Sequence, residues 1–240
     1  MISIIIPTLN EARGLPQLLK AFPPYLRERF DLEIIISDGG STDDTLGVAR
    51  TTGARIVQHT AGTPQTIAEA RNVGAAQARG EILLFLDADS TLSEPERFLQ
   101  RITDTMRNPN TLAATTKLQI APEQRTLADS FWQGLFNITF CWSNRLGFGT
   151  ARGNCQIIRA DAFVKAKGYN EQLVAGEDFD LFHRLGKRGH IAFLTDLVVY
   201  ESPRRFRRLG YLRTVLLWNL NFFSILLTKR SISKNWQRVD

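Results

Sequence analysis

Residues 80–89 read Gly-Glu-Ile-Leu-Leu-Phe-Leu-Asp-Ala-Asp, in which an apolar run of five residues is followed by two carboxylates. A short run of this kind predicts a strand that is buried on both faces. Asp87 and Asp89 then lie at the carboxyl end of that strand, the edge at which open α/β sheets bind ligands. Carboxylates spaced in this way suit Mg²⁺ or Mn²⁺, which also takes oxygens from a bound diphosphate. An acidic turn that only solvates the strand end is the competing interpretation.

The first half of the chain alternates strand and helix patterns around this stretch. Strands are predicted at residues 3–7, 32–37, 55–58 and 82–86, and helices at residues 11–21, 42–52 and 66–78. Repeated units of this size predict a mostly parallel, Rossmann-like central sheet with helices on both faces. The predicted fold class is therefore α/β.

The second half is less regular. It predicts helices at residues 95–106 and 178–188 and strands at residues 113–120, 156–159 and 191–200. An aromatic-rich segment at residues 127–146 either packs in the core or forms a flap over an acceptor. Its aromatic residues are Phe131, Trp132, Phe136, Phe140 and Trp142. Because no change of composition marks a second domain, we predict one domain at residues 1–202 and an extension at residues 203–240.

Composition limits the class of protein. The 240-residue chain has a net charge of +6 and two cysteines, which excludes a disulfide scaffold and gives no cluster of the Cys/His metal-binding type. A reducing, cytoplasmic location fits this cysteine content. The chain enters a strand pattern at its first residues, so no signal peptide is predicted.

The positive charge is concentrated in the extension, where nine basic residues stand against one acidic residue. The apolar core of residues 215–227 is shorter than the roughly 20 residues that cross a bilayer. We therefore predict an amphipathic C-terminal helix that lies peripherally on the inner face of a membrane. A helix docked on the protein, with a solvated basic face, is the alternative. Nucleic-acid binding is disfavoured because the charge is confined to an apolar segment.

Three further segments place polar residues where strands end or helices begin. Asp38 and Gly40 follow the second predicted strand, where glycine allows a ligand to approach the backbone and the next helix N-terminus favours an anion. Arg71, on a predicted helix, either neutralises a phosphate or forms a surface salt bridge. Glu177 and Asp178 open a helix, where they either offset its dipole or supply a catalytic base.

With these segments in this order, residues 1–200 resemble the family-2 glycosyltransferases with a GT-A fold, including non-processive members such as those similar to dolichol-phosphate mannose synthase. The resemblance implies an inverting, metal-dependent transfer of sugar from a nucleoside-diphosphate sugar of the UDP or GDP type, with Mg²⁺ or Mn²⁺ as cofactor. It assigns metal binding to Asp87 and Asp89, and the catalytic base to Asp178. It assigns Pro7, Thr8, Glu11 and Asp38 to the nucleotide. We add Gly40, Arg71, Asp87 and Ala88 as further candidate nucleotide-sugar residues.

By the same resemblance, Asn154 and Glu177 line the diphosphate and acceptor side. Arg204 and Arg205 follow the last predicted strand, and paired arginines suit bidentate contacts to a diphosphate. Glu201, just before them, is a further candidate metal ligand. A basic stripe that faces lipid headgroups is the alternative role of the two arginines.

Several alternatives stay open. The Gln-x-x-Arg-Trp motif of processive polysaccharide synthases is absent from the sequence, which disfavours a polymerase. A hydroxyl of a lipid-linked or saccharide acceptor fits the retained acidic pair at 177–178, whereas a polyprenyl phosphate is already ionised and needs no base. A nucleotidyltransferase is disfavoured because no Gly-rich, basic signature follows the first strand. Self-association is left open.

Overall fold

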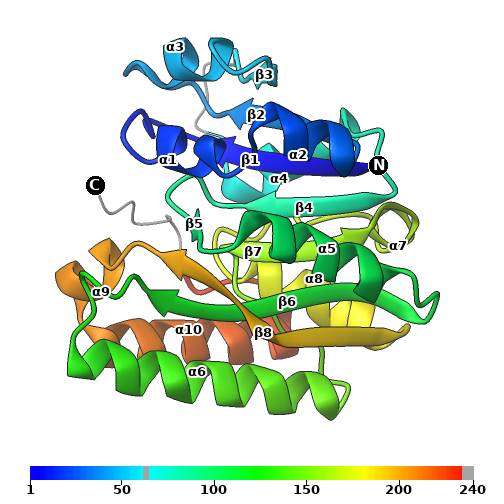
Figure 1. Ribbon diagram of the computed structural model, residues 1–240. Coiled ribbons are helices and arrows are strands. Elements are labelled where there is room, and N and C mark those ends of the chain that lie inside the picture. Colours follow the sequence, from blue (N-terminus) through cyan, green and yellow to red (C-terminus); the bar gives the residue numbers. More distant parts are fainter. Residues whose placement is uncertain (62–64, 234–240) are drawn as a thin grey trace.

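The structure is a computed structural model that describes residues 1–61 and 65–233 (Figure 1). Lys234 and Arg238, two of the basic residues assigned to the extension, lie outside the described residues. The described chain forms an eight-stranded sheet in the order β3-β2-β1-β4-β7-β6-β8-β5. The strands are β1 (Ile2–Thr8), β2 (Leu32–Asp38), β3 (Arg55–Gln58), β4 (Ile82–Leu86), β5 (Thr91–Leu92), β6 (Thr111–Ile120), β7 (Cys155–Arg159) and β8 (His190–Glu201).

Strand direction divides the sheet into two parts. β3, β2, β1 and β4 are parallel to one another, as the alternating first half of the sequence predicts. β7 runs antiparallel to both β4 and β6, while β6 and β8 are again parallel. β5 pairs antiparallel with the end of β8. The prediction of a mostly parallel α/β sheet is confirmed.

The central strands are buried on both faces. Because successive side chains of a strand point to opposite sides, Ile4 and Ile6 of β1 belong to one hydrophobic cluster and Ile5 belongs to another. Helices cover both clusters (Figure 1). They are α1 (Leu15–Lys20), α2 (Pro24–Arg29), α3 (Thr45–Arg50), α4 (Ile67–Ala76), α5 (Pro95–Met106), α6 (Leu127–Arg145), α7 (Ala160–Lys165), α8 (Glu177–Gly186), α9 (Arg204–Leu209) and α10 (Tyr211–Thr228).

The first two predicted helices start later than the sequence pattern indicates. Residues 11–14 lie outside α1 because the preceding loop is bound to the loop after β2. Asn10 has a left-handed φ of 53°, and its side-chain oxygen accepts hydrogen bonds from the backbone of Thr42 and Asp43. Glu11 N–H in turn donates to Thr45 Oγ1. Asn10 therefore orders the second loop rather than capping α1.

The aromatic-rich segment forms α6, which packs on β6 and β8 beside α10 (Figure 1). Phe136 joins Phe206 and Tyr211 in a third hydrophobic cluster, so the core interpretation holds for it. Phe131 and Trp142 are exposed, and core packing is wrong for them. No helix among the described residues is long and apolar enough to cross a membrane. The boundary predicted between residues 202 and 203 stays a prediction.

Candidate active site

Asp38 organises the loop after β2. It is fully buried at the end of the strand, opposite Thr8 in the parallel register of β1 and β2. Its Oδ2 accepts hydrogen bonds from Thr8 Oγ1 at 3.1 Å and Ser41 Oγ at 2.5 Å. Its Oδ1 accepts from the backbone N–H groups of Gly40 at 3.1 Å and Ser41 at 2.8 Å. Four donors match the four lone-pair positions of a carboxylate, so Asp38 fixes the shape of this loop.

Asp87 and Asp89 follow β4 at the same edge of the sheet. Asp87 Oδ1 accepts a hydrogen bond from Arg71 Nη2 at 3.0 Å, and its backbone N–H lies 3.4 Å from Asn154 O. Burial raises the pKa of Asp87, while the charge of Arg71 opposes that rise. Between the two carboxylates, Ala88 is buried in the core cluster. Both aspartate side chains keep about a quarter of their surface exposed, so they are accessible to a ligand.

Arg71 lies beneath these carboxylates rather than on the surface. Its side chain is 2% exposed. The guanidinium donates to Glu177 Oε1 at 2.7 Å, Asp87 Oδ1 at 3.0 Å and Gly153 O at 3.1 Å. Burial alone lowers the pKa of Arg71, but the charges of the surrounding acids outweigh it and raise that pKa. The surface salt bridge weighed from the sequence is wrong. A direct phosphate contact is also unsuited to a guanidinium engaged in this way.

Glu177 and Asp178 form the first turn of α8, after Gly176 in a left-handed conformation with φ of 81°. Burial and the neighbouring Asp178 raise the pKa of Glu177 to about 7. Burial likewise raises the pKa of Asp178, although Arg71 opposes it. Glu177 points to Arg71, whereas Asp178 is partly exposed. A partly exposed carboxyl with a raised pKa is suited to accept a proton near neutral pH.

Arg204 and Arg205 approach the carboxylates from α9. Arg204 Nη2 lies 2.8 Å from Asp89 Oδ2 and 3.3 Å from Glu11 Oε1. Burial lowers the pKa of Arg205, and the charges of Asp87, Glu201 and Asp89 oppose that effect. The arrangement concentrates two guanidinium groups beside the acidic pair.

Glu201 has a different environment from the one predicted for it. Its carboxylate is buried and accepts hydrogen bonds from Gln133 Nε2 at 2.6 Å and Arg152 Nη2 at 2.5 Å. Arg152 also lies over the rings of Phe136 and Trp218, at 5.4 and 5.5 Å from the ring centroids. Within residues 1–61 and 65–233, no three His, Cys, Asp or Glu side chains group as metal ligands do. The geometry thus makes Glu201 an internal ion-pair partner. No sequence motif indicated Arg152 or Gln133 as its partners.

The remaining predicted residues lie close to the same edge. Pro7 is buried in β1, and Asn154 presents its backbone carbonyl to Asp87 N–H and to Ser90 Oγ. Glu11 reaches the site through Arg204. The structure therefore brings together the ends of β1, β2 and β4, the start of α8 and the start of α9.

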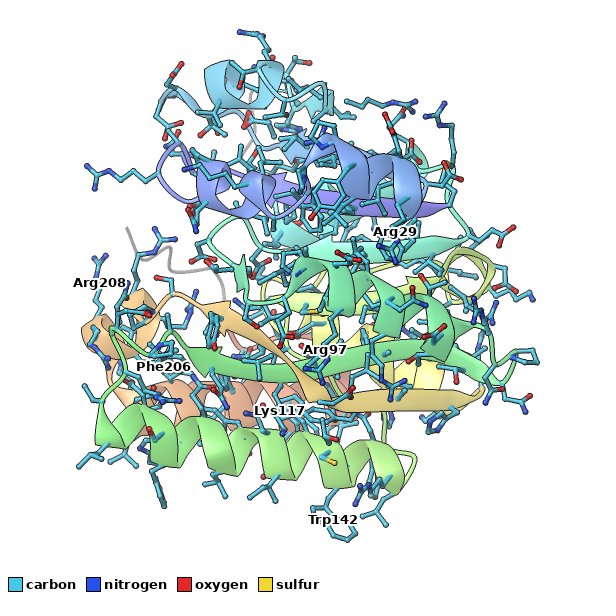
Figure 2. The ribbon with its side chains drawn as sticks, in the orientation of Figure 1. Arg29, Arg97, Lys117, Trp142, Phe206 and Arg208 are labelled. Carbon is cyan, nitrogen blue, oxygen red and sulfur yellow. The ribbon has the colours of Figure 1, made fainter. Side chains whose placement is uncertain are left out.

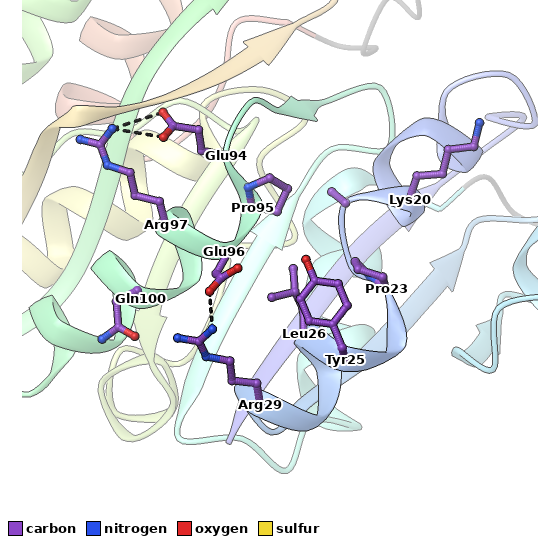
Figure 3. Close-up of a pocket in the computed structure, with 11 residues that line it drawn as sticks. Lys20, Pro23, Tyr25, Leu26, Arg29, Glu94, Pro95, Glu96, Arg97 and Gln100 are labelled. Atoms are coloured by element: carbon purple, nitrogen blue, oxygen red, sulfur yellow. Dashed lines mark hydrogen bonds and ion pairs between the residues drawn. The ribbon is translucent and has the colours of Figure 1, made fainter.

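A surface recess of about 550 Å³ lies elsewhere, between α2 and α5 (Figure 3). Both of its glutamates pair with arginines of the same recess: Glu96 with Arg29, and Glu94 with Arg97 at 3.2 Å. These pairs leave the recess without a convergent set of acids, so the chemistry of the sheet edge identifies the candidate active site instead.

Known proteins resemble this chain in sequence and in fold. Residues 3–165 match the family model described as "Glycosyl transferase family 2". The succinoglycan biosynthesis protein ExoA of Rhizobium meliloti is 28% identical over 211 residues, which cover 80% of this chain and 60% of ExoA. The chain thus spans about three fifths of the length of this relative.

Solved structures share the fold. A mannosyltransferase from Pyrobaculum calidifontis, in complex with GDP-Man and Mn²⁺, gives a TM-score of 0.68 at 20% identity, covering 88% of this chain and 61% of that chain. Glucosyl-3-phosphoglycerate synthase from Mycobacterium tuberculosis, with Mn²⁺, UDP and glucosyl-3-phosphoglycerate, gives 0.61 at 19% identity, covering 95% and 79%. These likenesses confirm the predicted fold.

Proposed function

Because the chain belongs to glycosyl transferase family 2, we propose that it transfers a sugar, with inversion and metal dependence, from a nucleoside-diphosphate sugar to a hydroxyl of a lipid-linked or membrane-associated acceptor. One observation carries this proposal. The loop held by Asp38, the pair Asp87 and Asp89, and the acids at the start of α8 converge at one edge of the sheet. A donor, a metal and an acceptor can meet there.

The donor is proposed to be of the UDP or GDP type. The two structural neighbours described above contain GDP-Man or UDP, which supports both nucleotides. In this proposal the loop around Gly40 receives the nucleotide, and Asp38 acts through the shape of that loop. Arg204 and Arg205 supply positive charge for the diphosphate.

Asp87 and Asp89 would hold Mg²⁺ or Mn²⁺ together with oxygens of the diphosphate. Their hard oxygen donors fit such a cation. The guanidinium of Arg204 pairs with both Asp89 and Glu11, which indicates that the negative charge at this position attracts a cation. When bound, the metal would neutralise negative charge on the departing nucleoside diphosphate.

Asp178 is proposed to accept the proton of the acceptor hydroxyl. Its raised pKa supports this role, because a base works best when its pKa lies near the operating pH. Arg71 fixes Glu177 beside it and acts as a positioning residue in this proposal, since its guanidinium contacts Glu177 and Asp87. A polyprenyl-phosphate acceptor would not need this base, so a variant of Asp178 separates the two acceptor classes.

The proposal also includes association with a membrane. Arg207, Arg208, Lys229 and Arg230 lie at the ends of the apolar helix α10, an arrangement that favours an anionic surface. The chain would then act peripherally, at the cytoplasmic face of the membrane.

The test measures binding of UDP and GDP by calorimetry with and without Mn²⁺, in the wild type, in Asp89→Ala and in the control Asp104→Ala. Asp104 is an acidic residue of α5 that pairs with Arg107 away from the site. We expect Mn²⁺ to strengthen binding of one nucleotide in the wild type and in the control but not in Asp89→Ala. Metal-independent binding in all three proteins, or equal Mn²⁺ dependence in all three, would contradict the proposal.

A further inference from the structure

α6 carries an apolar stripe that faces away from the protein. Its inward residues include Gln133, Phe136 and Asn137, which contact β6, β8 and the third hydrophobic cluster. At 3.6 residues per turn, the exposed apolar residues fall on the opposite side of the helix. They are Leu127, Phe131, Leu135, Ile138 and Trp142. Figure 2 shows Trp142 at the lower edge of the molecule, pointing away from the sheet.

A second stripe runs along α10. Tyr211, Thr214, Asn221 and Ile225 are its buried residues, and the exposed apolar residues again lie opposite them. The exposed residues are Leu212, Leu216, Leu220, Phe223 and Leu227. The two helices contact each other through aromatic pairs: the rings of Trp132 and Tyr211 stack at 5.6 Å, and those of Phe136 and Trp218 lie 5.5 Å apart. The two helices lie side by side in Figure 1, and we call their two exposed stripes together the α6–α10 face.

Charges around the face identify its occupant. The helices themselves contain Asp129, Arg145 and Arg213, and Asp129 is buried in an ion pair with Arg207. Basic residues flank the helices at both ends, and Glu123 is the acidic residue that precedes α6 most closely in the sequence. Apart from Arg207, the flanking basic residues are Arg125 and Arg208 before the helices, and Arg145, Lys229 and Arg230 at their ends.

This pattern favours a lipid surface over a second copy of the chain. Because both ends of the face are basic, stacking two copies would bring like charges together in either orientation. An anionic bilayer instead neutralises both ends, while the apolar stripes enter the boundary between headgroups and acyl chains. Trp142 is the residue type that prefers this boundary.

We infer that the α6–α10 face docks the protein on an anionic lipid bilayer, with α6 as an equal partner of the C-terminal helix. The inference deepens the membrane association proposed above and rests on it, but it is independent of which sugar is transferred. It also assigns a role to the exposed apolar stripe of α6, which lies outside the three hydrophobic clusters.

The experiment is co-sedimentation with vesicles of phosphatidylcholine mixed with phosphatidylglycerol, and with vesicles of phosphatidylcholine alone. The test variant is Phe131→Ser with Trp142→Ser, which removes two aromatic side chains of α6 that are 64% and 56% exposed. The matched control is Tyr25→Ser, which removes a 59% exposed aromatic from α2, far from this face in Figure 1. Circular dichroism and Mn²⁺-dependent nucleotide binding check that each variant folds.

We expect the wild type and Tyr25→Ser to bind the mixed vesicles more tightly than phosphatidylcholine alone. The double variant should partition about tenfold more weakly, because each aromatic contributes apolar area that leaves water. Equal partitioning of all three proteins, or no binding by the wild type, would overturn the inference. Loss of a dimer in the double variant by sedimentation velocity, with unchanged vesicle binding, would also overturn it by making the face an interface between copies.

Failure of the inference is distinguishable from failure of the proposed function, because vesicle binding requires no nucleotide. A second readout uses quenching of tryptophan emission by brominated lipid. In Trp142→Phe, which keeps the aromatic bulk, we expect unchanged partitioning and a smaller quenched fraction. An unchanged quenched fraction would place Trp142 outside the bilayer and contradict docking through α6.

Discussion

Replacing Arg71 by methionine removes a buried guanidinium while it keeps an unbranched side chain in place. The loss deprives Glu177 and Asp87 of their shared cation and leaves Gly153 O without this donor. The guanidinium also lies 5.4 Å from the ring centroid of Tyr169. One change therefore leaves two acids at the candidate active site without their positive partner.

The expected cost follows from burial. Breaking a buried ion pair by removing one partner costs about 3–5 kcal/mol, because the remaining charge stays desolvated. Burial raises the pKa of Glu177 to about 7 even with Arg71 present, and loss of the guanidinium would raise that pKa further. The folded state then binds a proton that the unfolded state has released, so stability rises as pH falls from 8 to 5. The wild type also gains stability over this range, but the higher pKa of Glu177 in Arg71→Met makes the gain of the variant larger, so its deficit should shrink from pH 8 to pH 5.

The assay is urea unfolding at pH 8 and pH 5, followed by circular dichroism. The matched control is Arg97→Met, since Arg97 forms an exposed ion pair with Glu94 on the surface. Exposed pairs contribute little, so the control should change by no more than about 0.5 kcal/mol at either pH. Stability of Arg71→Met equal to that of the control at pH 8 would refute the reasoning. A deficit of the same size at both pH values would refute the role assigned to the carboxylates.

Three further predictions address other parts of the molecule. Asp178→Asn removes the proposed base, so we expect a fall in kcat of about 10²- to 10⁴-fold with donor binding retained, and near-normal turnover would indicate a phosphate acceptor. Asp38→Asn replaces an acceptor of four hydrogen bonds by an amide, so nucleotide affinity should fall about tenfold in calorimetry, whereas unchanged affinity would contradict its role in shaping the loop. Hydrogen bonds from Arg207, and then from Tyr211, hold the pKa of Asp129 below its usual range, so this carboxylate stabilises the fold above the unfolded pKa near 4 and loses that contribution as pH falls below it. Asp129→Asn should therefore cost about 2 kcal/mol in urea unfolding at pH 7 and less at pH 3, and an equal cost at both pH values would contradict the charge-based account.

The strands that carry the site could be predicted from the sequence. β1, β2 and β4 are short apolar runs, and their periodicity and length are local properties that need no knowledge of the partner strands. The positions of Asp38 and Asp87 at strand ends follow directly, because the parallel register of these strands places their carboxyl ends together. The acids at 177–178 were also recognised from their place at a helix start.

The starts of α1 and α3 were predicted less accurately, because contacts between distant residues set them. α1 begins at Leu15 because Asn10 and Glu11 bond to residues more than thirty positions away. A propensity pattern contains no information on such contacts. The outward apolar face of α6 was likewise beyond the sequence, because an apolar side chain in a helix pattern usually indicates the core.

The sequence by itself determined which chemical groups follow which strands: the carboxylates after β4, the acidic pair that opens α8 and the basic extension. Only the tertiary structure decided the partner of each charge. Arg71 lies 106 positions from Glu177, and Glu201 is neutralised by Arg152 rather than left for a metal. Such pairs form wherever folding brings opposite charges into the same desolvated space, since a buried charge without a partner is unstable. That condition depends on the whole packed chain, and no local pattern of residues expresses it.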